Sequence, residues 1–341
     1  MKTKLSFLVA ALLITCIANA QSIITVDNSN GANAQYSDLQ SAISAASSGD
    51  IIQVHASEIN YGDISIDKPL TLIGFSHGDA DKKTSVDEIN LLDNTSNLTI
   101  SGFHITNDIN ALNDTVEITN LIIENNNIDG TFWSGSSRAG VNNMIFRGNI
   151  IYRVGSNTTT WLNYTNATFS NNIFTNSLYV DFHESTTIKN NVFINASHPV
   201  NVSNSSGDLE IQNCIFIESS SATLNINSDG VVYDNCLTYN IGSGSYSTLN
   251  GNNNLNNQNP NFISVTGGVF NSETDDYHLQ AGSPAIGSGV GGIDMGIYDG
   301  SAFTFNNLGY TNGIPTVKIT DITDRIAPNA TLTVTINTNA N

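Results

Sequence analysis

The residue types that could do chemistry gather in the middle of this 341-residue chain, between residues 138 and 201. They combine flat aromatic side chains with cationic, acidic and amide groups: Arg138, Trp161, Tyr179, Asp181, His183 and Asn201. Such a set suits a sugar, because an aromatic ring packs on a pyranose while polar groups bind its hydroxyls or carboxylate. We therefore expect these residues to line a substrate-binding face, with His183 and Arg138 as candidates for proton transfer. The alternative is that Trp161 covers a loop and His183 is a hydrogen-bonded structural residue.

A repeat with a nearly constant period organises this part of the chain. Each copy has a β-branched or aromatic residue two positions before a Gly or Asn, which we call the anchor. Seven anchors follow one another at steps of 23, 23, 23, 19, 23 and 22 residues: Gly102, Asn125, Gly148, Asn171, Asn190, Asn213 and Asn235. A fixed period of this size is typical of a solenoid, in which each repeat buries its apolar face against its neighbours. Counting ten residues back from successive anchors places Arg138 and Trp161 on neighbouring coils.

The residue types within each copy indicate which solenoid this is. The apolar residues are β-branched or aromatic, they alternate over short runs, and no copy contains the ten or more residues of helical periodicity that a helix-bearing repeat needs. We expect an all-β fold, a single-stranded parallel β-helix with coils of 22–23 residues and like residues stacked at roughly 4.8 Å per rung. Gly and Asn both tolerate left-handed backbone angles, so the anchors predict a tight turn.

The column that follows the anchor predicts an internal ladder of stacked amides. Its members are Phe103, Asn126, Asn149, Asn172, Asn191, Cys214 and Cys236. The two cysteines are 22 residues apart, which is one coil, and neighbouring rungs lie within reach of a disulfide. An exported protein can form such a bond. The alternative is that Cys214 and Cys236 are small apolar residues that continue the column.

The first 20 residues have the pattern of a secretory signal peptide. Lys2 and Lys4 precede an apolar run from Leu5 to Ile17, and Ala18-Asn19-Ala20 is a small-x-small cleavage site. No other apolar stretch approaches the 18 or more residues of a membrane span. The sequence therefore predicts a protein that is secreted or held at the cell surface, without a transmembrane segment.

The charge balance disfavours one class of partner. Removing Lys2 and Lys4 leaves 9 basic residues against 30 acidic ones, so the formal net charge changes from −19 to −21. Nucleic-acid binding needs clustered Lys and Arg that displace counterions, so nucleic acid is excluded as an expected partner. A polyanionic glycan would need a local basic patch or bridging cations.

Residues 21–310 form the predicted β-helix domain, and its start contains a capping helix at about residues 37–48. Ser37 or Asp38 is the expected N-cap and Gly49 the expected stop. The apolar face consists of Leu39, Ala42, Ile43 and Ala46. A helix here would cover the open end of the solenoid, where unpaired strand groups would otherwise invite aggregation.

Residues 311–341 do not follow the repeat. Two alternating stretches, 314–320 and 331–337, predict strands that form either a hairpin-like cap or a C-terminal β tail.

Motifs at both ends resemble those of one family. The N-terminal motifs are Tyr36-x-x-Leu39-Gln40-x-Ala42-Ile43, Gly49-Asp50-x-Ile52-x-Val54 and Ile66-x-Lys68-Pro69-Leu70-Thr71-Leu72-x-Gly74. The C-terminal motifs are Asp276-Tyr277-His278-Leu279, Ser283-Pro284-Ala285-Ile286 and Asp294-Met295-Gly296. Together they resemble the pectate-lyase-like right-handed parallel β-helix proteins, over roughly residues 24 to 300. The resemblance implies a right-handed fold and an association with extracellular polysaccharide; the superfold hosts lyases, hydrolases, binding proteins and adhesins alike.

The family's lyases suggest what catalysis would require here. Their substrate lies across the strand face opposite the Asn turn, which is where the six residues named first are expected. The segment from Asn171 to Phe193 is similar to lyases of the alginate and chondroitin class, which keep an Arg-His-Gly stretch between two Asn-x-Phe motifs. By that comparison His183 is kept, but Phe182 and Glu184 stand where the class has Arg and Gly.

Calcium is the one cofactor that the resemblance suggests, since β-helix lyases often bridge an acidic glycan to acidic side chains through this ion. Asp181 and Glu184 are the best-placed ligands, because oxygens from one loop can close around the ion at roughly 2.3–2.6 Å. The alternative is that both carboxylates face solvent and bind nothing.

Two functions remain open from the sequence. The first is an exported β-helix protein that binds and degrades extracellular polysaccharide, with lyase chemistry if it is an enzyme. The second is a non-catalytic cell-surface adhesin or structural β-helix protein.

Overall fold

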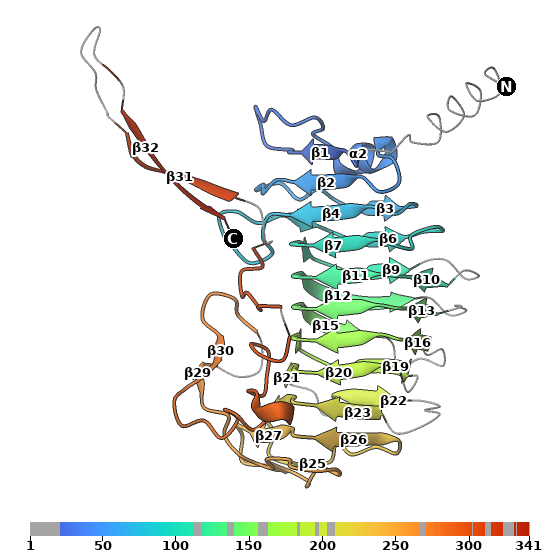
Figure 1. Ribbon diagram of the computed structural model, residues 1–341, viewed down its shortest axis with the longest axis vertical. Helices are drawn as coiled ribbons and strands as arrows, with labels where there is room; N and C mark the ends of the chain where they lie inside the picture. The colour runs from blue at the N-terminus through green and yellow to red at the C-terminus, as the bar shows by residue number, and fades with distance from the viewer. Residues whose placement is uncertain are drawn as a thin grey trace, which may run out of the picture.

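The computed structural model describes residues 21–111, 117–134, 140–155, 163–182, 185–194, 198–202, 209–265, 270–301, 303–310, 315–322, 331 and 333–340. It is a right-handed parallel β-helix whose coils stack along the long axis of the molecule (Figure 1). The predicted fold class is therefore confirmed. The signal-peptide prediction lies outside the described residues.

One side of the solenoid is a ten-stranded parallel sheet. In spatial order it consists of β1 (Ile23–Val26), β2 (Ile51–Val54), β4 (Thr71–Gly74), β7 (Thr99–Ser101), β11 (Ile122–Glu124), β14 (Ile145–Arg147), β17 (Thr168–Ser170), β20 (Thr187–Lys189), β23 (Leu209–Gln212) and β26 (Val231–Asp234). The strand register follows the repeat, because Ile123 pairs with Ile100 on one side and Phe146 on the other. The same register brings Glu124 beside Arg147, whose Nη2 lies 2.7 Å from the Glu124 carboxylate.

The remaining sides of the coils form a sixteen-stranded sheet. Its strands are β3 (Ile64–Ile66), β5 (Ser85–Val86), β6 (Ile89–Leu91), β8 (His104–Ile105), β9 (Ile109–Ala111), β10 (Ile118–Thr119), β12 (Asn127–Ser134), β13 (Val141–Asn142), β15 (Ile150–Val154), β16 (Asn163–Thr165), β18 (Ile173–Phe174), β19 (Leu178–Phe182), β21 (Val192–Ile194), β22 (Val200–Val202), β24 (Ile215–Glu218) and β27 (Leu237–Asn240). Two short strands, β25 (Thr223–Leu224) and β28 (Ser245–Tyr246), form a separate parallel pair. The rings of Phe174, Phe193 and Phe216 stack inside successive coils, with centroids 4.7 and 5.1 Å apart.

The anchors adopt the left-handed turn that their residue types predict. The five Asn anchors have φ between 52° and 55°, and the two Gly anchors have φ of 82° and 65°. The next column forms the predicted amide ladder. Asn149 is representative: its Oδ1 accepts from the backbone N–H of Asn126 at 3.0 Å, and its Nδ2 donates to the carbonyl of Ile123 at 2.8 Å.

Helix α2 (Leu39–Ala45) lies across the N-terminal end of the solenoid (Figure 1). The side chain of Asp38 accepts from the N–H of Ser41 at 2.7 Å, so it is the predicted N-cap. The helix ends earlier than expected, with Ala46 rather than Gly49 at its C-cap. The Lys68 ammonium lies 3.3–3.4 Å from three carbonyls of this last turn, which satisfies groups that a helix C-terminus leaves unpaired.

Residues 276–301 and 303–310, which we call the strap, fold back along one side of the coils (Figure 1). The strap includes β30 (Asp276–Leu279), paired antiparallel with β29 (Phe262–Ser264), and a 3₁₀ turn, η1 (Val290–Gly292). It covers an outer face that is apolar at Ile173, Val192 and Ile215, and packs Met295 and Ile297 into the same cluster. The strands that carry these three isoleucine and valine residues, β18, β21 and β24, are therefore buried on both faces.

The anchor side chains also hold the strap. Nδ2 of Asn171 donates to the carbonyls of Ile297 and Asp299, both at 2.9 Å, and Nδ2 of Asn235 donates to the carbonyl of Ser288 at 2.8 Å. The anchor column thus supplies both the turn geometry and the amide groups that fix the strap against the solenoid.

The chain continues from the strap into an antiparallel hairpin of β31 (Pro315–Ile322) and β32 (Val334–Ala340). It extends from the N-terminal half of the solenoid (Figure 1). The predicted strands of residues 311–341 are thus present as a hairpin. In the part of the chain that the structure describes, no helix has the length and apolarity that crossing a membrane requires.

Candidate functional site

The predicted substrate-binding face is placed only in part. Tyr179 of β19 and Asn201 of β22 are direct partners on neighbouring strands, as the coil register requires. Asp181 pairs with Asn163 of β16. Asn201 Nδ2 donates to the carbonyl of His198 at 2.7 Å, so that amide is already engaged. The other four predicted site residues lie outside the described residues: Arg138, Trp161, His183 and Glu184.

Calcium remains a prediction. One of its two proposed ligands, Glu184, lies outside the described residues. Among those that are described, no group of three or more His, Cys, Asp or Glu side chains is arranged to hold a metal ion.

The two cysteines lie on neighbouring coils as free, buried thiols. Cys214 Sγ accepts from the backbone N–H of Asn191 at 3.4 Å, in the place where the next ladder amide would accept. Cys236 Sγ donates to the carbonyl of Ile211 at 3.3 Å. Burial, reinforced by the adjacent Cys214, raises the pKa of the Cys236 thiol. In this state the pair continues the ladder column.

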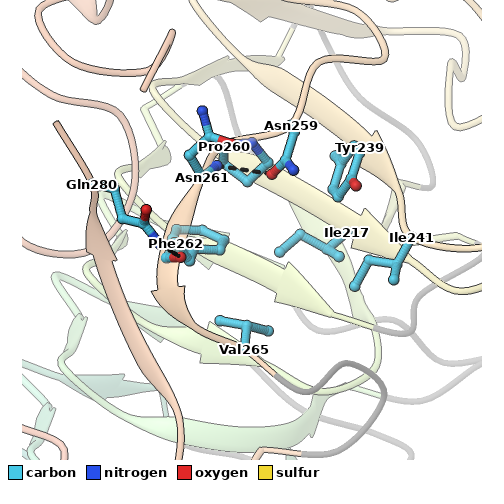
Figure 2. A pocket seen from close by; sticks show the side chains of 9 residues that line it. All are labelled: Ile217, Tyr239, Ile241, Asn259, Pro260, Asn261, Phe262, Val265 and Gln280. Carbon is cyan, nitrogen blue, oxygen red and sulfur yellow. Dashed lines mark hydrogen bonds between the residues drawn. The ribbon is translucent and has the colours of Figure 1, made fainter. Parts of the chain in front are cut away.

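A pocket of about 250 Å³ opens where the strap side of the solenoid meets the last coils (Figure 2). Its lining is Ile217, Tyr239, Ile241, Asn259, Pro260, Asn261, Phe262, Val265 and Gln280. Ile217 and Tyr239 are register partners on β24 and β27, so both come from the rigid solenoid. Figure 2 shows Phe262 across Ile217 from Tyr239, with Asn259 and Pro260 at one end of the space. We call this site the C-terminal pocket.

The opposite wall of the C-terminal pocket is held in place by packing and backbone hydrogen bonds. The Phe262 ring meets the buried Tyr277 ring edge-on, with centroids 5.1 Å apart and an interplanar angle of 69°. The backbone N–H of Gln280 donates to the carbonyl of Asn261, and Gln280 Nε2 donates to the carbonyl of Phe262, both at 2.8 Å. A wall fixed in this way is organised before a ligand arrives.

Several polar groups of the pocket are uncommitted. Asn259 Oδ1 accepts from the backbone N–H of Asn261 at 2.8 Å, which leaves the Asn259 N–H groups available. Within the described part of the chain, the Asn261 amide and the Tyr239 hydroxyl have no hydrogen-bond partner. The site therefore combines apolar and aromatic walls with a few free donors and acceptors, which is the usual make-up of a small-molecule site.

A second cleft, of about 420 Å³, lies at the other end of the strap and has different chemistry. It is lined by Ser57, Glu58, Asn60, Ala80, Asp81, Lys83, Ser85, His104 and Thr106. Two of its polar side chains are already paired with carboxylates outside the lining: His104 Nε2 lies 2.8 Å from Asp129 Oδ2, and Thr106 Oγ1 donates to Asp87 at 3.0 Å. Its described lining residues include no Tyr, Phe or Trp, so they offer no broad apolar face for a sugar ring. We call it the N-terminal cleft.

The sequence contains one signal for the C-terminal pocket beyond the spacing of the anchors. Continuous apolar runs follow the later anchors, such as Val192-Phe193-Ile194 and Ile215-Phe216-Ile217. Such runs indicate a strand buried on both faces. They predict that another segment must cover the outer face, although not which segment it is.

Comparison of the chain with protein-family models and with curated proteins gives no match.

Proposed function

We propose that this protein is exported and that it binds extracellular polysaccharide through the C-terminal pocket. The observation that supports the proposal is the combination of Tyr239 and Phe262 rings with the free amide groups of Asn259 and Asn261 in one concave site. Rings of this kind pack on the apolar face of a sugar, and amides bind its hydroxyls. The expected signal peptide at residues 1–20 and the charge balance, which disfavours nucleic acid, agree with an extracellular glycan as partner.

Affinity electrophoresis tests the proposal directly. The mature protein runs through native gels that contain single polysaccharides, and retardation measures binding. Tyr239→Ala removes one wall of the pocket and is expected to weaken binding about tenfold or more. Tyr152→Ala is the matched control, because Tyr152 is 42% exposed on β15 and does not line the pocket. If the wild-type protein, Tyr239→Ala and Tyr152→Ala are retarded equally, binding at this site is contradicted.

Degradation of the polysaccharide is a separate part of the proposal. It rests on the resemblance to β-helix lyases and on His183 and Arg138 as the groups that would move protons. The absorbance of unsaturated products, followed over a panel of uronate polysaccharides, measures this activity. His183→Ala is expected to abolish this activity. Retardation of the protein by the polysaccharides that the C-terminal pocket binds is expected to persist, because none of the residues assigned to binding is changed.

A rigid spacer or adhesin is the second candidate function. It is favoured by the continuous amide ladder from Asn126 to Asn191 and by the strap, which fixes successive coils to one another. A spacer requires stiffness and no ligand. If the protein is a spacer, Tyr239→Ala should not change the attachment of cells that carry the protein to a glycan-coated surface. If the protein binds polysaccharide through the C-terminal pocket, this attachment should fall.

A further inference from the structure

We infer that the C-terminal pocket selects an uncharged sugar, and that it holds one ring at a time. This inference rests on the proposed function and narrows its substrate class. It departs from the uronate substrates that the resemblance to β-helix lyases implies.

The first observation concerns charge. The lining of the C-terminal pocket contains no Lys, Arg or His among the described residues, and no Asp or Glu. A uronate carboxylate that entered would lose water without gaining a cationic partner, and burying an unpaired charge is costly. An uncharged sugar meets no such penalty, because its hydroxyls can bond to the Asn259 and Asn261 amides.

The second observation is the field of the whole molecule. Acidic residues outnumber basic ones by 30 to 11. The potential around such a protein lowers the local concentration of polyanions and slows their approach. Arg147, a cation beside the strap, is already paired with Glu124, and its Cζ lies 5.1 Å from the ring centroid of Phe303.

The third observation is size. Pockets for drug-sized ligands typically enclose roughly 300–1,000 Å³, and the C-terminal pocket encloses about 250 Å³. The space between Tyr239 and Phe262 therefore matches a single ring, such as a chain end or a side branch (Figure 2). A long run of sugars would have to extend beyond it.

Matched glycosides test the inference, since methyl β-glucoside and methyl β-glucuronide differ only at C6. The same comparison with the galactose and mannose pairs covers the common hydroxyl arrangements. Ligand-observed NMR with the full mature protein measures each dissociation constant. The uncharged member of at least one pair is expected to bind at least tenfold more tightly, with an affinity that changes less than twofold between low and high salt.

Two variants assign the selectivity to this pocket. Asn261→Gly removes one amide yet keeps the left-handed turn, because Asn261 has a φ of 51° that glycine adopts freely. It is expected to weaken the neutral sugar about five- to tenfold. Tyr239→Ala is expected to weaken binding of the neutral sugar about tenfold or more, while Tyr152→Ala leaves it unchanged.

The possible outcomes separate the inference from the proposed function. Uronates that bind as tightly as their neutral partners, or more tightly, would overturn the inference and leave polysaccharide binding intact. If internal segments of a polysaccharide bind the C-terminal pocket as tightly as its chain ends do, the inference that the pocket holds one ring at a time is overturned. If neither monosaccharides nor polysaccharides bind in a manner that depends on Tyr239, the proposed function itself fails.

Discussion

The buried and exposed asparagine columns of this solenoid use the same side chain and nearly the same step along the chain in opposite surroundings. The buried column is Asn126, Asn149, Asn172 and Asn191, and all four are fully buried. The exposed column runs through Asn97, Asn120 and Asn143, whose amides also bond from coil to coil at steps of 23 residues. In the first column each amide also satisfies backbone groups of the adjacent coil; in the second, water competes for every bond.

This difference separates geometry from energy. A hydrogen bond contributes little where water can replace it, but an unpaired polar group inside the protein costs roughly 1–3 kcal/mol. Asparagine is needed in the exposed column mainly for the backbone conformation of the turn, since Asn97, Asn120 and Asn143 all have φ near 60°. We therefore expect the buried column to determine stability and the exposed column to tolerate change.

The largest effect is expected for Asn149→Ala. The substitution leaves the N–H of Asn126 without its acceptor and the carbonyl of Ile123 without its side-chain donor, both inside the coil. We expect a loss of about 3–5 kcal/mol in the free energy of unfolding. Denaturant titration followed by circular dichroism measures it. A loss below about 1 kcal/mol would mean that buried water replaces the amide and that the two columns are equivalent.

The strap is expected to show an intermediate effect. Ile297 is 1% exposed, and Ile297→Ala removes apolar contacts between the strap and the solenoid. A loss of about 2–4 kcal/mol is expected, because the remaining strap side chains close the space only in part. Hydrogen exchange should increase in residues 285–305 before it increases in the coils. Ile263→Ala is the control, since Ile263 is 53% exposed and its loss should change stability by less than about 0.5 kcal/mol.

A comparison of the stacked coils with the strap also shows how far the sequence could predict the fold. The period, the left-handed anchors and the amide ladder follow from neighbouring coils, so Asn149 could be placed from its spacing alone. The strap depends on contacts such as Asn171 with Ile297, more than a hundred residues apart, and no local pattern specifies that pairing. The C-terminal pocket could not be predicted for the same reason, because it is formed by residues far apart in the sequence, such as Ile217 and Phe262.

The predicted substrate face illustrates a different limit. The strand register places Tyr179 beside Asn201, because the pairing of these strands follows the repeat. The sugar-binding role of Arg138, Trp161 and His183 stays a prediction, since repeat spacing fixes positions within a coil but not the paths of the loops between strands.

Acid should weaken the junction where the strap ends. His77 is buried beneath Gly309, and among the residues that the structure describes neither of its ring nitrogens has a hydrogen-bond partner. Burial, with a smaller contribution from nearby His104, lowers the pKa of His77 to about 3. The unfolded chain takes up a proton near pH 6.5, so the stability is present above that pH and declines as the pH falls toward 3, by up to about 1.4 kcal/mol per pH unit.

Replacement of the imidazole tests this pH dependence. His77→Phe keeps a planar ring and removes the titrating group. The part of the loss in unfolding free energy that His77 causes between pH 6.5 and 4 should therefore be absent in this variant. His55→Phe is the control, because the His55 side chain is 55% exposed. Thermal melts at half-unit pH steps make the comparison. Parallel acid profiles for the wild-type protein and His77→Phe would show that other groups determine the loss.

The smallest effect is expected for the exposed column. Asn120→Gly removes an amide that donates to Asn97 and accepts from Asn143, and it keeps the left-handed backbone, for which Asn120 has a φ of 56°. The bonds are open to water, so the loss should stay below about 1 kcal/mol. Asn120→Ala removes the same amide but places a Cβ in the left-handed region, which costs roughly 1 kcal/mol more. If the two variants are equally stable, the turn does not require the special backbone angle. If Asn120→Gly alone costs as much as Asn149→Ala, the exposed amides support the coils as strongly as the buried ones, and burial does not distinguish the two columns.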